Sequence, residues 1–227
     1  MLILCIETTS TNCSVALAGE NGTFPNSFGI ENCIDLLEDQ SDKYSHGERL
    51  HVFIEQILER NHLTPRDLNA IAISSGPGSY TGLRIGVASA KGLCYSLGIP
   101  LIEIDTLTSL SKQAPADNET VLTFLDARRM EVYARVFKNQ NPVTPVQAVI
   151  LQEKSFEPFL NEATVIIGTG TKKFEEICVQ AEKITFVETM PSALTMCDLA
   201  IQKMQKSDIV TDIAYFEPLY LKEFKAG

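Results

Sequence analysis

The chain has 227 residues, a formal net charge of −10, 44% hydrophobic residues and 21% charged residues, a composition typical of globular proteins and not of disordered ones. No apolar run approaches the roughly 18 residues of a membrane span, and Met1–Ile6 lacks the basic lead of a signal peptide, so we expect a cytoplasmic protein without membrane attachment. Acidic residues outnumber basic ones by 29 to 19, which disfavours direct binding of nucleic acid, because cations supply most of that affinity.

The first half of the chain predicts a meander of strands followed by alternating helices and strands. Apolar residues at positions 50, 53, 54, 57 and 58 follow the helical period. A later helix is ended by Gly98, with Pro100 just beyond. The predicted elements are strands over 2–6, 13–18, 23–29 (after a turn at 19–22), 70–73 and 101–104, a glycine-rich loop over 74–82, and helices over 50–58, 83–97 and 106–114, the last capped by Asp105 or Thr106.

The second half of the chain repeats this order of elements. A tight turn at 127–130 separates its first two strands. The predicted elements are strands over 121–125, 132–137, 146–151 and 164–168, and helical segments over 155–160, 172–181 and 192–205. We infer two strand-strand-strand-helix-strand-helix lobes, residues 1–105 and 106–227, and hence an internally duplicated α/β fold.

The sequence predicts no metal site and no redox site. The three histidines, His46, His51 and His62, do not form the i, i+4 pair of a zinc hydrolase. The six cysteines include no CxxC pair. We therefore expect reduced thiols that serve as small apolar side chains.

The glycine-rich stretch Gly76–Gly82 lies between a predicted strand and a predicted helix, where backbone N–H groups can cradle a phosphate. Its GxGxxxG spacing is one residue longer than the dinucleotide fingerprint, and no Lys-Ser/Thr pair follows as in a P-loop. Ser79 lies outside any GxSxG nucleophile motif, so turn formation explains this serine better than hydrolysis does.

Small residues leave two sides of the following helix nearly bare: Gly82, Gly86, Ser89 and Ala90 on one, and Ala88, Gly92 and Ser96 on the other. Each interior glycine lowers helix stability by about 1 kcal/mol relative to alanine, so we expect a close contact that requires them. Two interpretations remain open. The small residues pack within the chain, for instance against the 50–58 helix, or they receive a second chain.

Several stretches of the sequence, taken in order, point to one family. The most specific is Ser75–Gly86 (SGPGSYTGLRIG), whereas residues 138–215 match weakly. The other stretches are Ile3–Ser10, Cys13–Leu17, His46 with Leu50, Asp126–Arg128 with Glu131–Tyr133, and Pro218–Leu221. Together they resemble the TsaB family, bacterial proteins needed for the threonylcarbamoyladenosine modification of tRNA and formerly described as glycoprotease-like.

The resemblance implies an actin-like (ribonuclease H-like) fold related to sugar kinases, with duplicated βββαβα lobes and mixed sheets flanked by helices. Active members of that fold hold phosphates at a DxG turn in the first hairpin of each lobe. Here Glu7-Thr8-Thr9 and Asp126-Ala127-Arg128 stand at these places. We expect Thr9 and Arg128, which replace glycine, to obstruct the approach of a phosphate or a positive φ. Gly168-Thr169-Gly170 resembles a remnant of an adenosine site, although an ordinary turn explains it better.

By the same resemblance the chain is a non-catalytic partner of TsaD, the related protein that carries the metal, the ATP and the transfer of threonylcarbamoyl to an adenosine of tRNA. The HxxxH metal pair of TsaD corresponds here to His46 and Leu50, which removes one ligand. The resemblance therefore implies a scaffold with no catalytic residue, metal or cofactor of its own. Nucleotide is expected only at the partner interface.

The resemblance also implies a heterodimer with TsaD, a larger complex that includes TsaE, a homodimer when the chain is alone, and contact with tRNA only through the complex. Family partners meet through the two helices of the first lobe. The corresponding residues are His46, Leu50, Phe53, Ile54, Gly78, Tyr80, Thr81, Arg84, Val87 and Ala88. Two alternatives stay open: an independent ATPase or kinase of the same fold, and a peptidase that uses Ser79.

Overall fold

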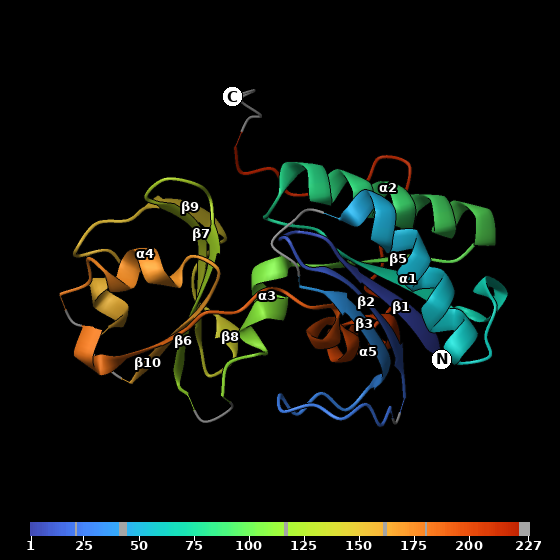
Figure 1. Ribbon diagram of the computed structural model, residues 1–227, viewed down its shortest axis with the longest axis horizontal. Coiled ribbons are helices and arrows are strands. Elements are labelled where there is room, and N and C mark those ends of the chain that lie inside the picture. The colour runs from blue at the N-terminus through green and yellow to red at the C-terminus, as the bar shows by residue number, and fades with distance from the viewer. Residues whose placement is uncertain (21, 41–44, 116–117, 161–162, 180, 223–227) are drawn as a thin grey trace.

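The computed structural model describes residues 1–222 except 21, 41–44, 116–117, 161–162 and 180, and it has two lobes that lie side by side (Figure 1). The N-terminal lobe contains a five-stranded mixed sheet in the order β3-β2-β1-β4-β5. The first three strands form an antiparallel meander, and β4 and β5 run parallel to β1. The strands are β1 (Leu2–Glu7), β2 (Cys13–Gly19), β3 (Cys33–Asp39), β4 (Ala70–Ser74) and β5 (Leu101–Ile104).

The C-terminal lobe repeats this topology. Its sheet has the order β11-β10-β6-β7-β8, with β9 also paired to β7. Here β6, β7 and β9 are antiparallel neighbours, while β10 and β11 run parallel to β6. The strands are β6 (Thr120–Asp126), β7 (Glu131–Lys138), β8 (Asn141–Pro142), β9 (Gln147–Ile150), β10 (Thr164–Gly168) and β11 (Ile184–Val187). The predicted duplication of an α/β lobe with a mixed sheet is therefore confirmed.

Helices cover both faces of the first sheet. On one face lie α1 (His46–Arg60) and α2 (Tyr80–Leu97), which pack against Leu4 and Ile6 of β1. On the other face lies α5 (Cys197–Gln205), which packs against Ile3 and Cys5. The alternation along β1 follows from the two-residue period of a strand that is covered on both sides.

Each sheet is followed along the chain by a helix that packs on the other sheet. Helix α3 (Thr106–Ser111) follows β5 but packs against Leu125 of the second sheet. Helix α5 follows β11 and completes the core of the first sheet, although the predicted division after residue 105 assigns it to the second lobe. The remaining helix is α4 (Thr171–Glu175), and the short 3₁₀ helices are η1 (Pro65–Asp67), η2 (Glu157–Phe159), η3 (Ala181–Lys183) and η4 (Ala193–Met196).

The third predicted strand, 23–29, is wrong. Pro25 has no N–H for a ladder, and the Asn26 side chain bonds to backbone groups of residues 24, 28 and 30, which holds the segment as a loop. The third strand is instead the acidic edge strand β3. Residue 21 of the predicted turn at 19–22 lies outside the described residues.

The other differences lie mostly in the second lobe. The predicted helix at 155–160 is only a 3₁₀ turn, the helix predicted over 172–181 is the short α4, and strand β11 was not predicted. Position 180 of that predicted helix lies outside the described residues. In the first lobe, α2 begins at Tyr80, three residues before the predicted start, because the Ser79 hydroxyl accepts a hydrogen bond from Gly82 N.

After α5 the chain crosses the N-terminal lobe as an irregular segment, residues 208–222, which we call the C-terminal strap. Val210 N donates to Leu101 O at the edge strand β5, and Leu219 N donates to Ser75 O beside the glycine-rich loop. Within the described part of the chain, no helix is both long and apolar enough to cross a membrane.

Candidate functional site

The turn after β1, Glu7-Thr8-Thr9, is buried and closed on itself. The Glu7 side chain is fully buried, and its Oε1 accepts hydrogen bonds of 2.5 Å from both the N–H and the hydroxyl of Thr9. Burial raises the pKa of this carboxyl, opposed in part by hydrogen bonds from Ser74 and Thr9. The first-lobe turn is therefore an interior structure with no opening toward solvent at Glu7, whose second carboxyl oxygen, Oε2, has no hydrogen-bond partner among the described residues.

The N-terminal end of α2 sits directly on this first-lobe turn. Ser79 N donates to Thr9 O over 2.7 Å, and Thr8 Oγ1 donates to Gly82 O over 2.8 Å. A Cβ atom at Gly78 or Gly82 would come closer than 3.0 Å to a carbonyl oxygen of the turn. The glycines of the SGPGSYTGLRIG stretch thus permit a backbone-to-backbone contact. The first-lobe turn therefore occupies the space next to this loop in which a cradled phosphate would lie.

This contact resolves part of the question raised by the two bare sides of α2. A Cβ atom at Gly86 would also come closer than 3.0 Å to Thr8 Oγ1. The side with Gly82 and Gly86 therefore packs within the chain, mainly against the first-lobe turn, and it also meets α1: an added Cβ atom at Gly82 would lie 3.4 Å from the His46 ring, and Ser89 Oγ lies 3.3 Å from His51 Nε2. The other side, with Gly92, has nothing within 4 Å of an added Cβ atom.

The turn after β6 has the opposite character. Arg128 has a φ of 68° and Arg129 a φ of 51°, so the expectation that an arginine obstructs a positive φ is wrong. The backbone is held from several sides: Arg128 N donates to Asp126 Oδ1 over 2.6 Å, and Ala127 N donates to Glu131 O over 3.0 Å. Both arginine side chains are exposed.

Two further segments fix this second-lobe turn. Asp126 N donates to Thr169 Oγ1 over 3.0 Å, and Lys222 of the C-terminal strap donates to Ala127 O and to the Glu131 carboxylate. A Cβ atom at Gly168 would come closer than 3.0 Å to Phe124 O. Gly168-Thr169-Gly170 therefore packs and hydrogen-bonds within the lobe, as expected of an ordinary structural turn.

His46 begins α1 and is buried, with its Nε2 2.8 Å from Ser10 O. Burial lowers the pKa of this imidazole, which favours the neutral ring. Leu50, four residues later, lies in the core. Within the described ranges no group of three or more His, Cys, Asp or Glu side chains could hold a metal ion, and all six cysteines are buried free thiols.

The predicted interface residues divide between core and surface. Leu50, Phe53, Ile54 and Val87 are buried between the helices and the first sheet. Thr81, Arg84 and Ala88 are exposed, while Gly78 and Tyr80 are half-buried. The apolar stripe of α1 thus stabilises this chain, and only the second group is placed to touch a partner.

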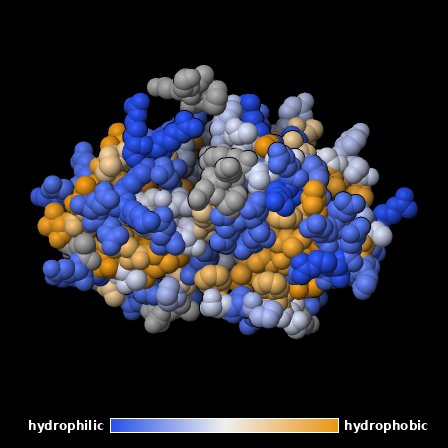
Figure 2. Space-filling model, viewed as in Figure 1, coloured by the Kyte–Doolittle hydropathy of each residue, from blue (hydrophilic) through white to orange (hydrophobic). Residues whose placement is uncertain are grey.

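The outward side of the two helices forms a shallow, open hollow of about 390 Å³. His51 Nε2 and Ser89 Oγ lie 3.3 Å apart across the two helices. Beside them Val52 is 40% exposed and Tyr95 is 90% exposed. Figure 2 shows apolar side chains reaching the surface of this lobe between charged ones. We call this surface the docking face; its residues are His51, Val52, Ala88, Ser89, Gly92, Leu93 and Tyr95.

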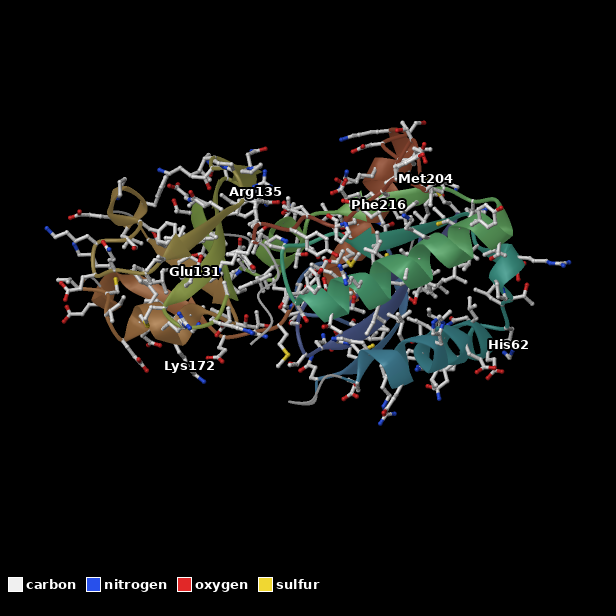
Figure 3. All side chains as sticks on the ribbon, turned by 90° about the horizontal axis from the view of Figure 1, so that it is seen from above. His62, Glu131, Arg135, Lys172, Met204 and Phe216 are labelled. Atoms are coloured by element: carbon white, nitrogen blue, oxygen red, sulfur yellow. The ribbon has the colours of Figure 1, made fainter. Side chains whose placement is uncertain are left out.

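The C-terminal strap borders α2 on the side opposite α1. Figure 3 shows α2 between α1 and the strap segment that carries Phe216. Lys91 Nζ donates to Ala214 O and Phe216 O, and the Tyr220 ring packs 5.0 Å from the Tyr80 ring. Sequence reasoning matched Pro218–Leu221 to a family but assigned it no place; the apolar residues Ile213 and Phe216, which pack on the first core, are the signal that could have located it.

Comparisons with known proteins identify relatives over nearly the whole chain. Residues 41–226 match the family model described as TsaD, tRNA N6-adenosine threonylcarbamoyltransferase. The chain is 30% identical to the tRNA threonylcarbamoyladenosine biosynthesis protein TsaB of Escherichia coli, over 98% of this chain and 95% of that protein. It is 27% identical to TsaB of Haemophilus influenzae, over 98% and 94%.

Among solved structures, YeaZ from Pseudomonas aeruginosa superposes with a TM-score of 0.80 at 22% identity, covering 97% of this chain and 99% of that one. A second Pseudomonas aeruginosa structure, described as similar to peptidase YEAZ, gives a TM-score of 0.81 with the same coverage. At this identity the match establishes the fold, which is the predicted actin-like arrangement of two mixed sheets flanked by helices.

Proposed function

Because the chain belongs to the TsaB family of tRNA threonylcarbamoyladenosine biosynthesis proteins, we propose that it serves this modification as a non-catalytic subunit that binds a TsaD-type threonylcarbamoyltransferase. The observation that carries the proposal is the covered first-lobe turn. The backbone of Ser79, the N-cap of α2, and of Gly82, within α2, fills the place where a catalytic relative of this fold would hold phosphate. With that place covered, we propose that the exposed sides of α1 and α2 serve for contact with a partner.

The proposed contact is the docking face on α1 and α2. The residues at its centre, Ala88 and Gly92, are small and exposed, and the exposed aromatic ring of Tyr95 lies at its rim. Small residues let a partner helix approach closely, and exposed tyrosines are frequent anchors of protein interfaces. In the absence of the TsaD-type partner, we propose that the same face pairs two copies of this chain.

The rest of the assembly follows from this role. The chain holds no cofactor of its own, nucleotide is bound only at the interface with the TsaD-type partner, and a TsaE-type subunit joins the larger complex in the cytoplasm. The tRNA is engaged by the complex, since the chain alone carries a formal charge of −10. In this assignment Ser79 serves as the N-cap of α2, where its hydroxyl accepts a hydrogen bond from Gly82 N over 3.3 Å.

The test uses Gly92→Leu. Because an added Cβ atom there meets nothing within 4 Å, the fold can accept leucine, and removing a helix glycine adds about 1 kcal/mol of helix stability. We expect the melting temperature to hold or rise while affinity for the TsaD-type partner, measured by calorimetric titration, falls about tenfold or more, as for a central interface position. Gln202→Leu, which places the same side chain on the exposed surface of α5, should change neither quantity.

Unchanged partner affinity in Gly92→Leu would overturn the docking face. Equal formation of threonylcarbamoyladenosine by the partner with and without this chain would overturn the role itself. Micromolar binding and turnover of Mg–ATP by the isolated chain would favour an independent ATPase instead.

A further inference from the structure

The backbone conformation of the second-lobe turn does not suit the residues that the sequence places there. A positive φ favours Gly and Asn, which adopt that conformation at little strain, and is uncommon for long side chains. In the loop between Asp126 and Val132, Arg128 and Arg129 have φ values of 68° and 51°. Long side chains at strained positions are retained where something outside the turn needs them, since strained residues gather at functional sites.

Few interactions inside the described chain engage the two arginines. Their side chains are exposed and make no ion pair within the residues that the structure describes, although burial raises the pKa of the nearby Tyr133 hydroxyl and the charge of Arg128 lowers that pKa in part. The neighbouring carboxylates are taken by other cations, Asp126 by Lys173 at 2.8 Å and Glu131 by Lys222. Arg128 and Arg129 are therefore two uncompensated charges on a chain that is acidic as a whole.

The turn lies next to the start of α2. In the strap, Tyr220 packs on Tyr80 while Lys222, two residues later, reaches the second-lobe turn. One helical turn into α2, the Arg84 guanidinium lies 4.1 Å over the Tyr80 ring and is exposed. Figure 1 shows the end of the strap and the start of α2 on the same side of the molecule as the β7–β9 end of the second sheet. Cations from both lobes thus gather along one side.

We propose that Arg128 and Arg129 contact the phosphate backbone of tRNA when the chain is assembled with its TsaD-type partner. The inference rests on the proposed function for the presence of tRNA in the complex. Guanidinium groups bind phosphate oxygens through paired hydrogen bonds, and a turn held by Asp126, Thr169 and Lys222 presents them without further ordering. Two contacts are too few to overcome the charge of the isolated chain, so the binding belongs to the complex.

The experiment replaces the pair by the residues that the turn geometry favours, Arg128→Asn with Arg129→Gly, in the complex with the TsaD-type partner. Affinity for tRNA is measured over a series of salt concentrations. Loss of two phosphate contacts should lower the slope of log affinity against log salt by about two and weaken binding at low salt roughly tenfold or more. The melting temperature of the variant should hold or rise, because Asn and Gly adopt a positive φ at less strain than Arg does.

Two controls separate charge, structure and position. Lys154→Asn with Lys206→Asn removes the same two charges from exposed sites elsewhere and should leave the salt slope unchanged. Arg128→Lys with Arg129→Lys keeps the charges and should retain most of the slope. A lower melting temperature with an unchanged slope would show that the arginines serve the fold and would overturn the inference.

Formation of the complex is measured first, so that the two proposals fail separately. If the unmodified chain does not bind the TsaD-type partner, the proposed function fails. If the complex forms and the Asn-Gly variant keeps the full salt slope for tRNA, only the arginine–phosphate contact fails. Loss of partner binding in the Asn-Gly variant would assign the arginines to an acidic protein surface and would equally overturn that contact.

Discussion

The two lobes share one topology, and the turns that come after their first strands occupy equivalent places, yet the turns differ in almost every physical respect. Glu7-Thr8-Thr9 is buried, hydrogen-bonded to itself and covered by the start of α2. Asp126-Ala127-Arg128 is exposed, held at its backbone by distant segments, and carries free guanidinium groups outward. The comparison shows that equivalent turns of a duplicated fold can be held in two ways, by burial under the start of a helix or by hydrogen bonds from distant segments of the chain.

The difference originates in the helix that packs beside each turn. In the first lobe, β4 leads into a glycine-rich helix start that can approach a carbonyl oxygen of Thr8 or Thr9 directly. In the second lobe, β10 leads into Gly168-Thr169-Gly170 and the short helix α4. Within the described residues, the polar contacts of this segment with the turn are one hydrogen bond, from Asp126 N to Thr169 Oγ1, and one ion pair, Lys173–Asp126. A long helix with bare sides can cover a turn, and a helix of five residues cannot.

The largest effect should come from breaking the covered turn with Gly82→Ala. The new Cβ atom would come closer than 3.0 Å to Thr8 O, which is backbone and cannot rotate away. Because overpacking of a rigid contact typically destabilises by roughly 1–3 kcal/mol and at times more, we expect a loss of about 3 kcal/mol in the free energy of unfolding, measured with urea. Gly92→Ala on the open side of α2 is the matched control and should stabilise by about 1 kcal/mol. If both variants gained stability, the contact between α2 and the first-lobe turn would be wrong.

An intermediate effect, dependent on pH, should follow from Glu7→Gln. Burial raises the pKa of Glu7 above its ordinary value of 4.5, so the folded chain holds this proton more tightly than the unfolded chain does. The native protein therefore loses stability from this group as the pH rises above 4.5 toward the folded pKa, and Gln removes the loss while its amide oxygen still accepts from Thr9. Unfolding free energies measured over a pH series that starts at 4.5 should favour the variant increasingly as the pH rises above that value. A difference between the two proteins that stays constant over the series would contradict a raised pKa of Glu7.

Sequence patterns predicted most of the first lobe and the interior of the second. The continuous apolar strands and the stripe of α1 are set by local burial, and Gly98 with a φ of 66° ends α2 where expected. The failures share a cause. The acidic strand β3 is defined by pairing with β2, and the positive φ of Arg128 by contacts from Thr169 and Lys222, far away in the sequence.

The motifs of the candidate site could be predicted from the sequence, but which of its side chains are exposed could not. The specific stretch Ser75–Gly86 located the start of α2, but the helical period of α1 does not say that Phe53 and Ile54 face this chain's own sheet instead of a partner. A stripe is equally apolar in both cases, so only tertiary packing decides. The exposed Tyr95 lies on α2, away from the apolar stripe of α1, and no periodic pattern in the sequence marks it as an interface residue.

The smallest effect should come from Lys222→Ala, which tests how the open turn is held. Lys222 bonds to Ala127 O and to the Glu131 carboxylate, and its side chain is 32% exposed, so water screens the pair and its loss should lower the free energy of unfolding by only about 1 kcal/mol. The local effect should be larger than the global one, because Lys222 bonds directly to the backbone of this turn, whereas the strap meets the start of α2 through the contact between Tyr220 and Tyr80. Amide hydrogen exchange at residues 127–131 should therefore accelerate while exchange in the covered first-lobe turn stays unchanged, whereas Lys222→Arg should preserve both rates. Equal acceleration in the two turns would mean that the strap stabilises the molecule as a whole, and the two turns would then not be held independently.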